Sequence, residues 1–157
     1  MPRPSIFATV LAGLIALQAS AALAVDTNTT RDAPDLTYVR SQIKAKKWEA
    51  AIQQLNAYID AGVQHADVYN LLGFSLRKSG DQKQAYTYYS KALDFDPEHK
   101  GALEYQGELF VETGQIERAK GNLEKLVKLC PTGCEEREDL EAAIAAFETG
   151  KPKPAHD

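Results

Sequence analysis

The two cysteines are the residues of this sequence best suited to chemistry. They are Cys130 and Cys134, separated by Pro-Thr-Gly, and the chain has no others. In an oxidising compartment, two cysteines this close are expected to form a disulfide. For so short a loop, the chain-entropy estimate of its contribution to stability is about 2 kcal/mol. The alternative is redox or metal chemistry, because Cys134 lies at a predicted helix N-terminus, where a thiol becomes more reactive, and thiolates select Cu(I).

Three glutamates form a second group with chemical potential. Glu104, Glu108 and Glu112 have i, i+4, i+8 spacing, which places them along one face of a predicted helix. They share one environment, so nothing distinguishes an acid from a base, and the stripe is not interpreted as a catalytic pair. The glycines are isolated rather than gathered in a phosphate loop, and no serine stands in a nucleophile elbow. The sequence therefore predicts no enzyme and no bound cofactor or metal.

The elements that position these residues repeat with a fixed period. Four residues recur 34 positions later: Gly73, Gly80, Ala85 and Pro97 return as Gly107, Gly114, Ala119 and Pro131. A period in this range is the mark of a repeat architecture. Between two stretches of helical periodicity, Gly80 is suited to positive φ and Asp81 to capping the next helix. A close helix approach is expected at Gly73, which has no side chain.

This period predicts an all-α domain over residues 34–147, with three helix-turn-helix repeats at about 32–65, 66–99 and 100–133. In the first repeat only the second helix is in register, and Lys46 stands where later repeats carry glycine. Pro34 is expected at the first helical position. An acidic helix over 135–147 is expected to cap the array, and 148–157 to form a disordered tail.

The best-defined repeat resembles the tetratricopeptide repeat family, which has the same period. The residues that carry the resemblance are Tyr69, Leu72, Gly73, Leu76, Ala85, Tyr89, Ala92 and Pro97. It extends over Asp32–Gly133, although Gln106 replaces the usual leucine of the third repeat. The resemblance implies antiparallel helix pairs stacked into a right-handed α-solenoid. Its concave groove, lined by the first helix of each repeat, would hold a peptide or a partner's helix.

Carried over by register, nine residues are expected to line this groove: Arg40, Lys44, Asn70, Phe74, Arg77, Lys78, Glu104, Glu108 and Glu112. The groove would be basic at its N-terminal end and acidic at its C-terminal end, with an exposed Phe74 as the apolar anchor between them. Such a groove favours a peptide of mixed charge in one orientation. The alternative interpretation is that these are ordinary solvated helix faces.

The cysteine segment has a resemblance of its own, which is looser. A Cys-Pro run closed by a second nearby cysteine is similar to the copper-binding segment of copper chaperones for oxidase assembly. A thiol-dependent copper-binding or redox protein that uses Cys130 and Cys134 is therefore the alternative to a binding module.

The first 24 residues have the features of a signal peptide. Arg3 precedes an apolar run over 6–17, and Ala22-Leu23-Ala24 forms a cleavage site, which leaves 25–33 as a flexible leader. No second apolar run of membrane-spanning length follows. The net charge of -4 and the absence of a basic patch argue against nucleic acid or an anionic membrane as partner. We therefore expect an exported bacterial protein, periplasmic or secreted, that binds a protein or peptide as an adaptor or assembly factor.

Overall fold

The structure, a computed structural model, describes residues 33–150, and within that range it contains helices and turns but no strand. The predicted signal peptide, nearly all of the leader and the end of the tail lie outside the described residues. The helices of the described range are α1 (Thr37–Lys44), α2 (Trp48–Asp60), α3 (Ala66–Ser79), α4 (Gln82–Phe95), α5 (Lys100–Glu112), α6 (Ile116–Leu129) and α7 (Glu135–Thr149).

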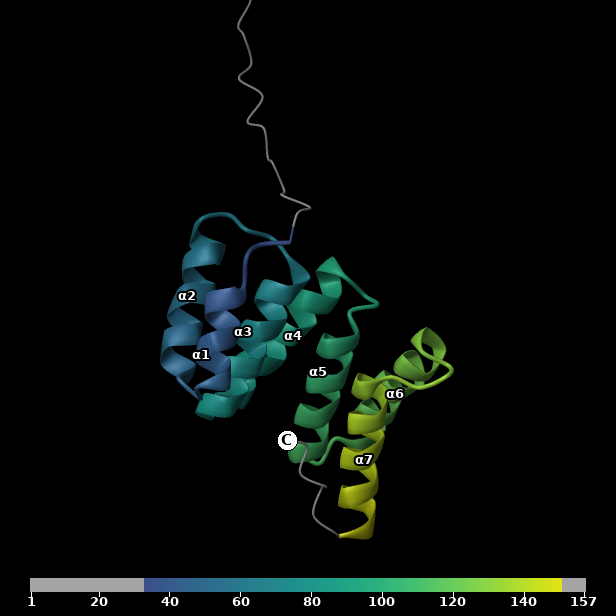
Figure 1. Ribbon diagram of the computed structural model, residues 1–157. Coiled ribbons are helices and arrows are strands. Elements are labelled where there is room, and N and C mark those ends of the chain that lie inside the picture. Colours follow the sequence, from purple (N-terminus) through teal and green to yellow (C-terminus); the bar gives the residue numbers. More distant parts are fainter. Residues whose placement is uncertain (1–32, 151–157) are drawn as a thin grey trace, which may run out of the picture.

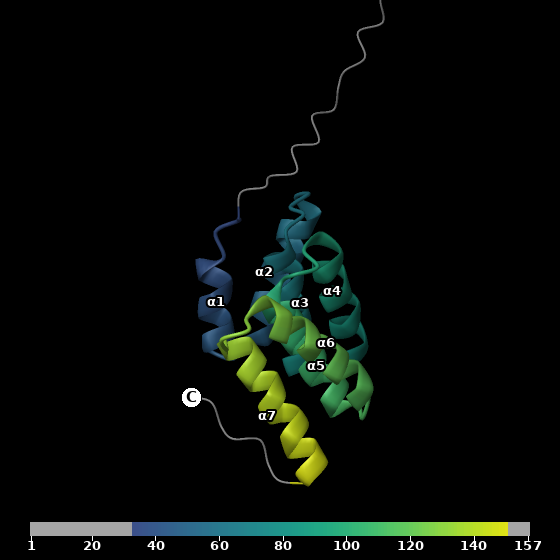
Figure 2. The same ribbon diagram turned by 90° about the vertical axis from the view of Figure 1, so that its right-hand side faces the viewer.

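The helices form three consecutive pairs and a final single helix. Each helix packs against the next, and α7 lies against both α5 and α6. Figure 1 shows the pairs following one another from α1 and α2 on the left to α6 and α7 on the right. The perpendicular view separates α1 from α4 and shows α7 beside α5 and α6 (Figure 2). The fold is an all-α solenoid of three helix-turn-helix repeats with a helix at its C-terminal end.

The turn inside each repeat uses the same backbone conformation at the same register position. Gly80 has φ of 100° and Gly114 has φ of 73°, and both follow the first helix of their repeats. Lys46, one repeat before Gly80, has φ of 55° and is the non-glycine residue with positive φ within residues 33–150. A side chain in this left-handed region costs about 1–2 kcal/mol. The first repeat therefore keeps the turn geometry although its sequence lacks the glycine.

Two mid-helix glycines allow close packing between helices. A Cβ at Gly73 would lie 2.7 Å from the ring of Tyr89, and a Cβ at Gly107 would lie 2.5 Å from Leu140. Tyr89 and Leu140 are both fully buried. The expected close approach at Gly73 is confirmed, and at Gly107 it is the capping helix that uses the space.

The apolar core consists of two large clusters and one small one. One cluster joins the first two repeats and includes Val39, Leu55 and Leu72. A second cluster joins the third repeat to α7 and includes Leu103 and Leu140. The boundary between the first and second repeats is here called the first joint, and that between the second and third repeats the second joint. A third, smaller cluster of Tyr69, Ala92 and Ala102 crosses the second joint, together with the polar contacts described below.

Two predicted helix boundaries were wrong. Pro34 is not helical, since α1 begins at Thr37 with Leu36 as its N-cap. The capping helix does not end at residue 147 but continues to Thr149, where Gly150 with φ of 65° terminates it. Its last turn is held by an ion pair of 2.8 Å between Lys120 and Glu148. Within the described range, no helix combines the length and apolar character needed to cross a bilayer.

Candidate functional site

The nine predicted groove residues lie on α1, α3 and α5, the first helices of the three repeats. The surface they occupy is here called the first-helix face. Four of them are exposed: Arg40, Lys44, Lys78 and Glu112. Phe74 and Glu108 are half-buried. The face therefore contains the predicted basic residues near its N-terminal end and one well-exposed glutamate near its C-terminal end.

Three of the predicted groove residues do not face solvent. Asn70 is 4% exposed, Arg77 6% and Glu104 6%. They lie where α3 packs against α5, and a Cβ at Gly101 of α5 would come 3.2 Å from the side-chain nitrogen of Asn70. Register predicted these residues to line an open groove and did not reveal how closely the neighbouring helix covers them.

A buried ion pair corrects the expectation of an open acidic stripe. The guanidinium of Arg77 lies 2.6 Å from a carboxylate oxygen of Glu108 and 3.6 Å from one of Glu112. It also donates to the backbone carbonyl of Tyr105 at 3.3 Å. The side-chain exposure of Glu108 is 13%, against 44% for Glu112. Because Arg77 compensates the inner part of the stripe, Glu112 is its main solvent-exposed member.

Phe74 is not the isolated exposed anchor that was expected. Its ring lies 6.2 Å from that of Trp48 and 4.8 Å from that of Tyr105, in a row of three aromatic side chains. Arg77 and Lys78 both place their cationic groups over the Phe74 ring, at 5.9 Å and 5.4 Å from its centroid. Burial, reinforced by nearby glutamates, raises the pKa of Tyr105 to about 12, so its hydroxyl stays neutral. Trp48 and Tyr105 were not among the predicted site residues, because neither stands at a position that the repeat period relates to Phe74.

Two histidines cap the helices at one edge of the second joint. His65 Nδ1 accepts from the backbone N–H of Asp67, and His99 Nδ1 accepts from that of Ala102. Because its Nδ1 is an acceptor, the neutral His99 ring carries its proton on Nε2, which donates to Asp67 at 3.0 Å. This hydrogen bond lowers the pKa of Asp67, with the charge of Arg40 acting in the same direction.

These histidines border a cavity of roughly 730 Å³. They stand at the same register position of two successive repeats, so the sequence did hold a signal for paired caps. It was overlooked because histidine is not a usual N-cap residue.

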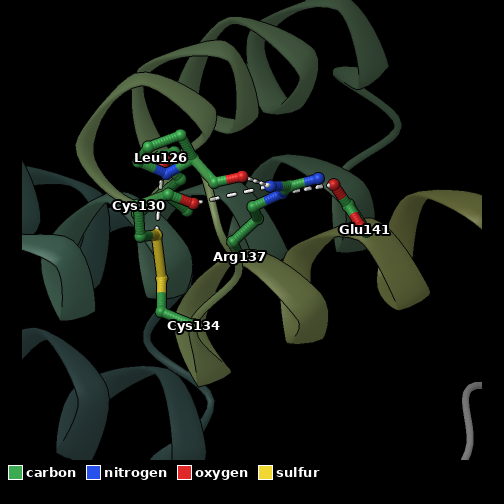
Figure 3. Close-up of a disulfide and its surroundings, with 6 residues drawn as sticks. Leu126, Cys130, Cys134, Arg137 and Glu141 are labelled. Atoms are coloured by element: carbon green, nitrogen blue, oxygen red, sulfur yellow. Dashed lines mark hydrogen bonds and ion pairs between the residues drawn. A yellow bond between two sulfur atoms is a disulfide. The ribbon is translucent and has the colours of Figure 1, made fainter.

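The cysteine pair lies where α6 meets the capping helix. The sulfur atoms of Cys130 and Cys134 are 2.05 Å apart, at bonding distance, and Cys134 is the N-cap of α7 (Figure 3). Arg137 of α7 reaches back over the turn and donates to the carbonyls of Cys130 and Pro131 at 3.4 and 3.3 Å. It also pairs with Glu141 at 2.8 Å (Figure 3). Side-chain hydrogen bonds thus connect the two sides of the same junction at which the sulfur atoms lie.

Metal coordination finds no support in the part of the chain that the structure describes. Among residues 33–150, no group of three or more His, Cys, Asp or Glu side chains is arranged to hold a metal ion. The copper-binding alternative therefore remains a sequence-based hypothesis.

Comparison with known proteins gives the family and the fold. Residues 66–99 match a family model described as a tetratricopeptide repeat, and residues 102–133 match a second model of the same description. A comparison with curated protein sequences gives no match.

Among solved structures, the chain is similar to the Yersinia enterocolitica type III secretion chaperone SycD, crystallised in complex with a peptide of the translocator YopD. The TM-score is 0.63 at 17% identity, over 73% of this chain and 89% of the chaperone chain. The two matched repeats correspond to α3 with α4 and α5 with α6, and α1 packs against α2 as a further pair before them. Residues 66–99 and 102–133 of this chain are therefore tetratricopeptide repeats, within an all-α solenoid.

Proposed function

We propose that this chain is an exported protein-binding module that holds a peptide or a partner's helix against its first-helix face. It would act as an adaptor or assembly factor in the cell envelope. The observation that carries the proposal is the row of half-buried aromatic rings, Trp48, Phe74 and Tyr105, with cationic groups placed over it. Aromatic and arginine side chains are enriched at the energetic centres of protein interfaces.

The charge distribution around this row defines the kind of partner. Exposed Arg40, Lys44 and Lys78 precede it or flank it, whereas exposed Glu112 and the acidic first turn of α7 follow it. Complementary charge contributes orientation and association rate more than affinity. We therefore infer a partner segment of mixed charge, with an apolar residue in contact with the aromatic row.

The similar structure supports a peptide as ligand. The chaperone to which this chain is similar was crystallised with a peptide of its translocator, so this solenoid architecture accommodates a peptide chain. The low identity transfers only the fold, and the sequence of the partner peptide is not inferred from it.

Export is the second part of the proposal, and it rests on the signal-peptide features of residues 1–24. In an oxidising compartment, the Cys130–Cys134 pair would be a disulfide that fastens the capping helix. N-terminal sequencing of protein recovered from fractionated cells tests this part. We expect a mature start near Val25 in the periplasmic or secreted fraction, and an uncleaved chain in the cytoplasm would refute it.

Charge reversal tests the binding surface. Lys78→Glu and Glu112→Lys change exposed residues on either side of the aromatic row, and Gln53→Lys on exposed α2 is the matched control. Partners are captured by crosslinking and affinity purification, and then quantified by mass spectrometry. The first two variants should each lose the main captured partner, by about tenfold if one well-placed ion pair is removed, while Gln53→Lys retains it. Equal capture by all three variants would exclude the first-helix face.

A further inference from the structure

The second joint also opens as a groove on the opposite side, between the second helices of two repeats. This α4/α6 groove has a volume of roughly 410 Å³. The lining residues that matter here are Tyr86 on α4, Gln106 and Phe110 on α5, and Arg118, Asn122 and Lys125 on α6. None of them belongs to the first-helix face.

The sequence departs from its own repeat at this groove in several positions together. One repeat earlier, Gln106, Asn122 and Tyr86 correspond to Leu72, Tyr88 and Ile52. Those three residues belong to, or pack against, the apolar cluster of the first two repeats. The first joint thus has Leu72 and the ring of Tyr88 at the positions where the second joint has the buried amides of Gln106 and Asn122. Departures from local sequence rules are expected at functional sites.

The polar floor of the groove is fully organised. The side-chain amide of Gln106 donates to Ser90 at 3.1 Å and accepts from Asn122 at 3.1 Å. Asn122 also donates to the backbone carbonyl of Leu103 at 3.0 Å. Burying amides costs free energy unless they are paired in this way. The floor is therefore a polar surface whose amide groups are fixed by hydrogen bonds.

Arg118 lies at the wall of the groove, in contact with two aromatic rings. Its guanidinium carbon lies 4.0 Å from the ring centroid of Phe110 and 5.0 Å from that of Tyr86. Two of its N–H groups donate, one to Tyr86 Oη at 2.9 Å and one to Gln115 at 2.6 Å. A guanidinium has five N–H groups in a planar fork that matches a carboxylate. The ring contacts and the two hydrogen bonds together restrict the orientation of this fork.

The charges around the groove favour an anion. Arg118 and exposed Lys125 are cationic, and Asp94 is the acidic side chain among the lining residues. A Cβ at Gly121 of α6 would meet no atom within 4 Å, so the groove stays open beside Arg118. Tyr86, which is 40% exposed, adds an apolar surface next to the cation.

We propose that the α4/α6 groove is a second docking site, which binds a carboxylate side chain from an acidic segment of a partner protein. The carboxylate pairs with the Arg118 fork, Lys125 strengthens the attraction at the rim, and Tyr86 contacts the hydrocarbon next to the acid. This site is distinct from the first-helix face, so its occupancy does not depend on the function proposed above.

Titration of the isotope-labelled protein with a capped peptide, acetyl-Gly-Glu-Tyr-Glu-Gly-amide, tests this proposal by NMR. The comparison peptide has both glutamates replaced by glutamine. We expect saturable shifts of the Arg118 Nε–H and Gly121 amide signals with the acidic peptide, and at least about tenfold weaker binding of its neutral twin. Binding should weaken as salt is raised.

Two variants with controls from the first joint locate the site. Arg118→Gln should weaken the acidic peptide by about tenfold or more. Lys125→Glu, at an exposed residue, should also weaken it while leaving the unfolding transition unchanged. Lys91→Glu and Gln84→Glu, at the corresponding positions of the preceding repeat, should leave binding unchanged.

Four results would overturn the proposal. They are no shift at about 10 mM peptide, equal binding of the acidic and the neutral peptide, shifts confined to the first-helix face, or displacement of the acidic peptide by an equal concentration of inorganic phosphate. The third result would leave the function proposed for the first-helix face intact, so the two failures are distinguishable.

Discussion

Lys46→Gly is expected to stabilise the protein, although glycine usually weakens a fold. Lys46 has φ of 55° at the position that Gly80 and Gly114 occupy in the other two repeats. Relief of the left-handed strain gains about 1–2 kcal/mol, and the greater freedom of glycine in the unfolded chain removes roughly 0.5–1 kcal/mol. The net expectation is an increase of about 0.5–1 kcal/mol in the free energy of unfolding.

Urea denaturation measures this change, with three variants as controls. Lys46→Ala removes the charge but keeps the strain, so it should not stabilise. Ala45→Gly introduces glycine at a residue with φ of -80° and should destabilise by roughly 0.5–1 kcal/mol. Gly80→Ala reverses the logic and should cost about 1 kcal/mol. If Lys46→Gly is no more stable than Ala45→Gly, the argument from repeat register is refuted.

Three further predictions follow from packing, charge and the cysteine pair. Gly107→Ala should destabilise the protein by about 1–3 kcal/mol, since its Cβ would overlap buried Leu140. Gly121→Ala, where the Cβ meets open space, should stabilise it by up to about 1 kcal/mol. The urea denaturation midpoints of the two variants measure this difference, and equal midpoints would contradict the packing at Gly107. Asp67→Asn should lower the free energy of unfolding by about 1 kcal/mol at neutral pH. The pKa of Asp67 is lowered from 3.8, so its contribution is present above about pH 4 and disappears as the pH falls through the lowered value. A penalty that is independent of pH in denaturation between acidic and neutral buffers would count against this. Cys134→Ser should lower the free energy of unfolding by about 2 kcal/mol without loss of helix signal, and an unchanged value on reduction of the parent protein would show that the sulfur atoms are not joined.

The periodic parts of the fold were predictable because each rests on a local physical requirement. Repeated spacing identified both helices of the second and third repeats, and the positive φ at Gly80 follows from the turn. Asp81 caps α4 as expected, by accepting from the backbone N–H of Gln84 at 2.9 Å. The end of α7 was misplaced by two residues, although Gly150, which terminates the helix with φ of 65°, is a local C-cap signal in the sequence.

The helices that carry the candidate site were predictable from the sequence, but the burial of its residues was not. Register assigns Arg77 and Glu104 to the inner side of their helices, yet the closeness of α3 and α5 determines that both are buried. The contribution of Trp48 to the aromatic row depends on how the second helix of one repeat meets the first helix of the next. Gln106 was visible as a departure from the repeat, but its role became apparent only with its partners Ser90 and Asn122.

Site-specific photocrosslinking tests the central claim, which is that a partner lies on the first-helix face. A photoreactive amino acid is placed at Lys78 beside the aromatic row, and at Gln53 on the outside of α2 as a control, since both positions are exposed. Expressed in its own cells, the protein should form a defined crosslinked adduct from position 78 and none from position 53. The same adduct from both positions, or an adduct from position 53 alone, would contradict the account.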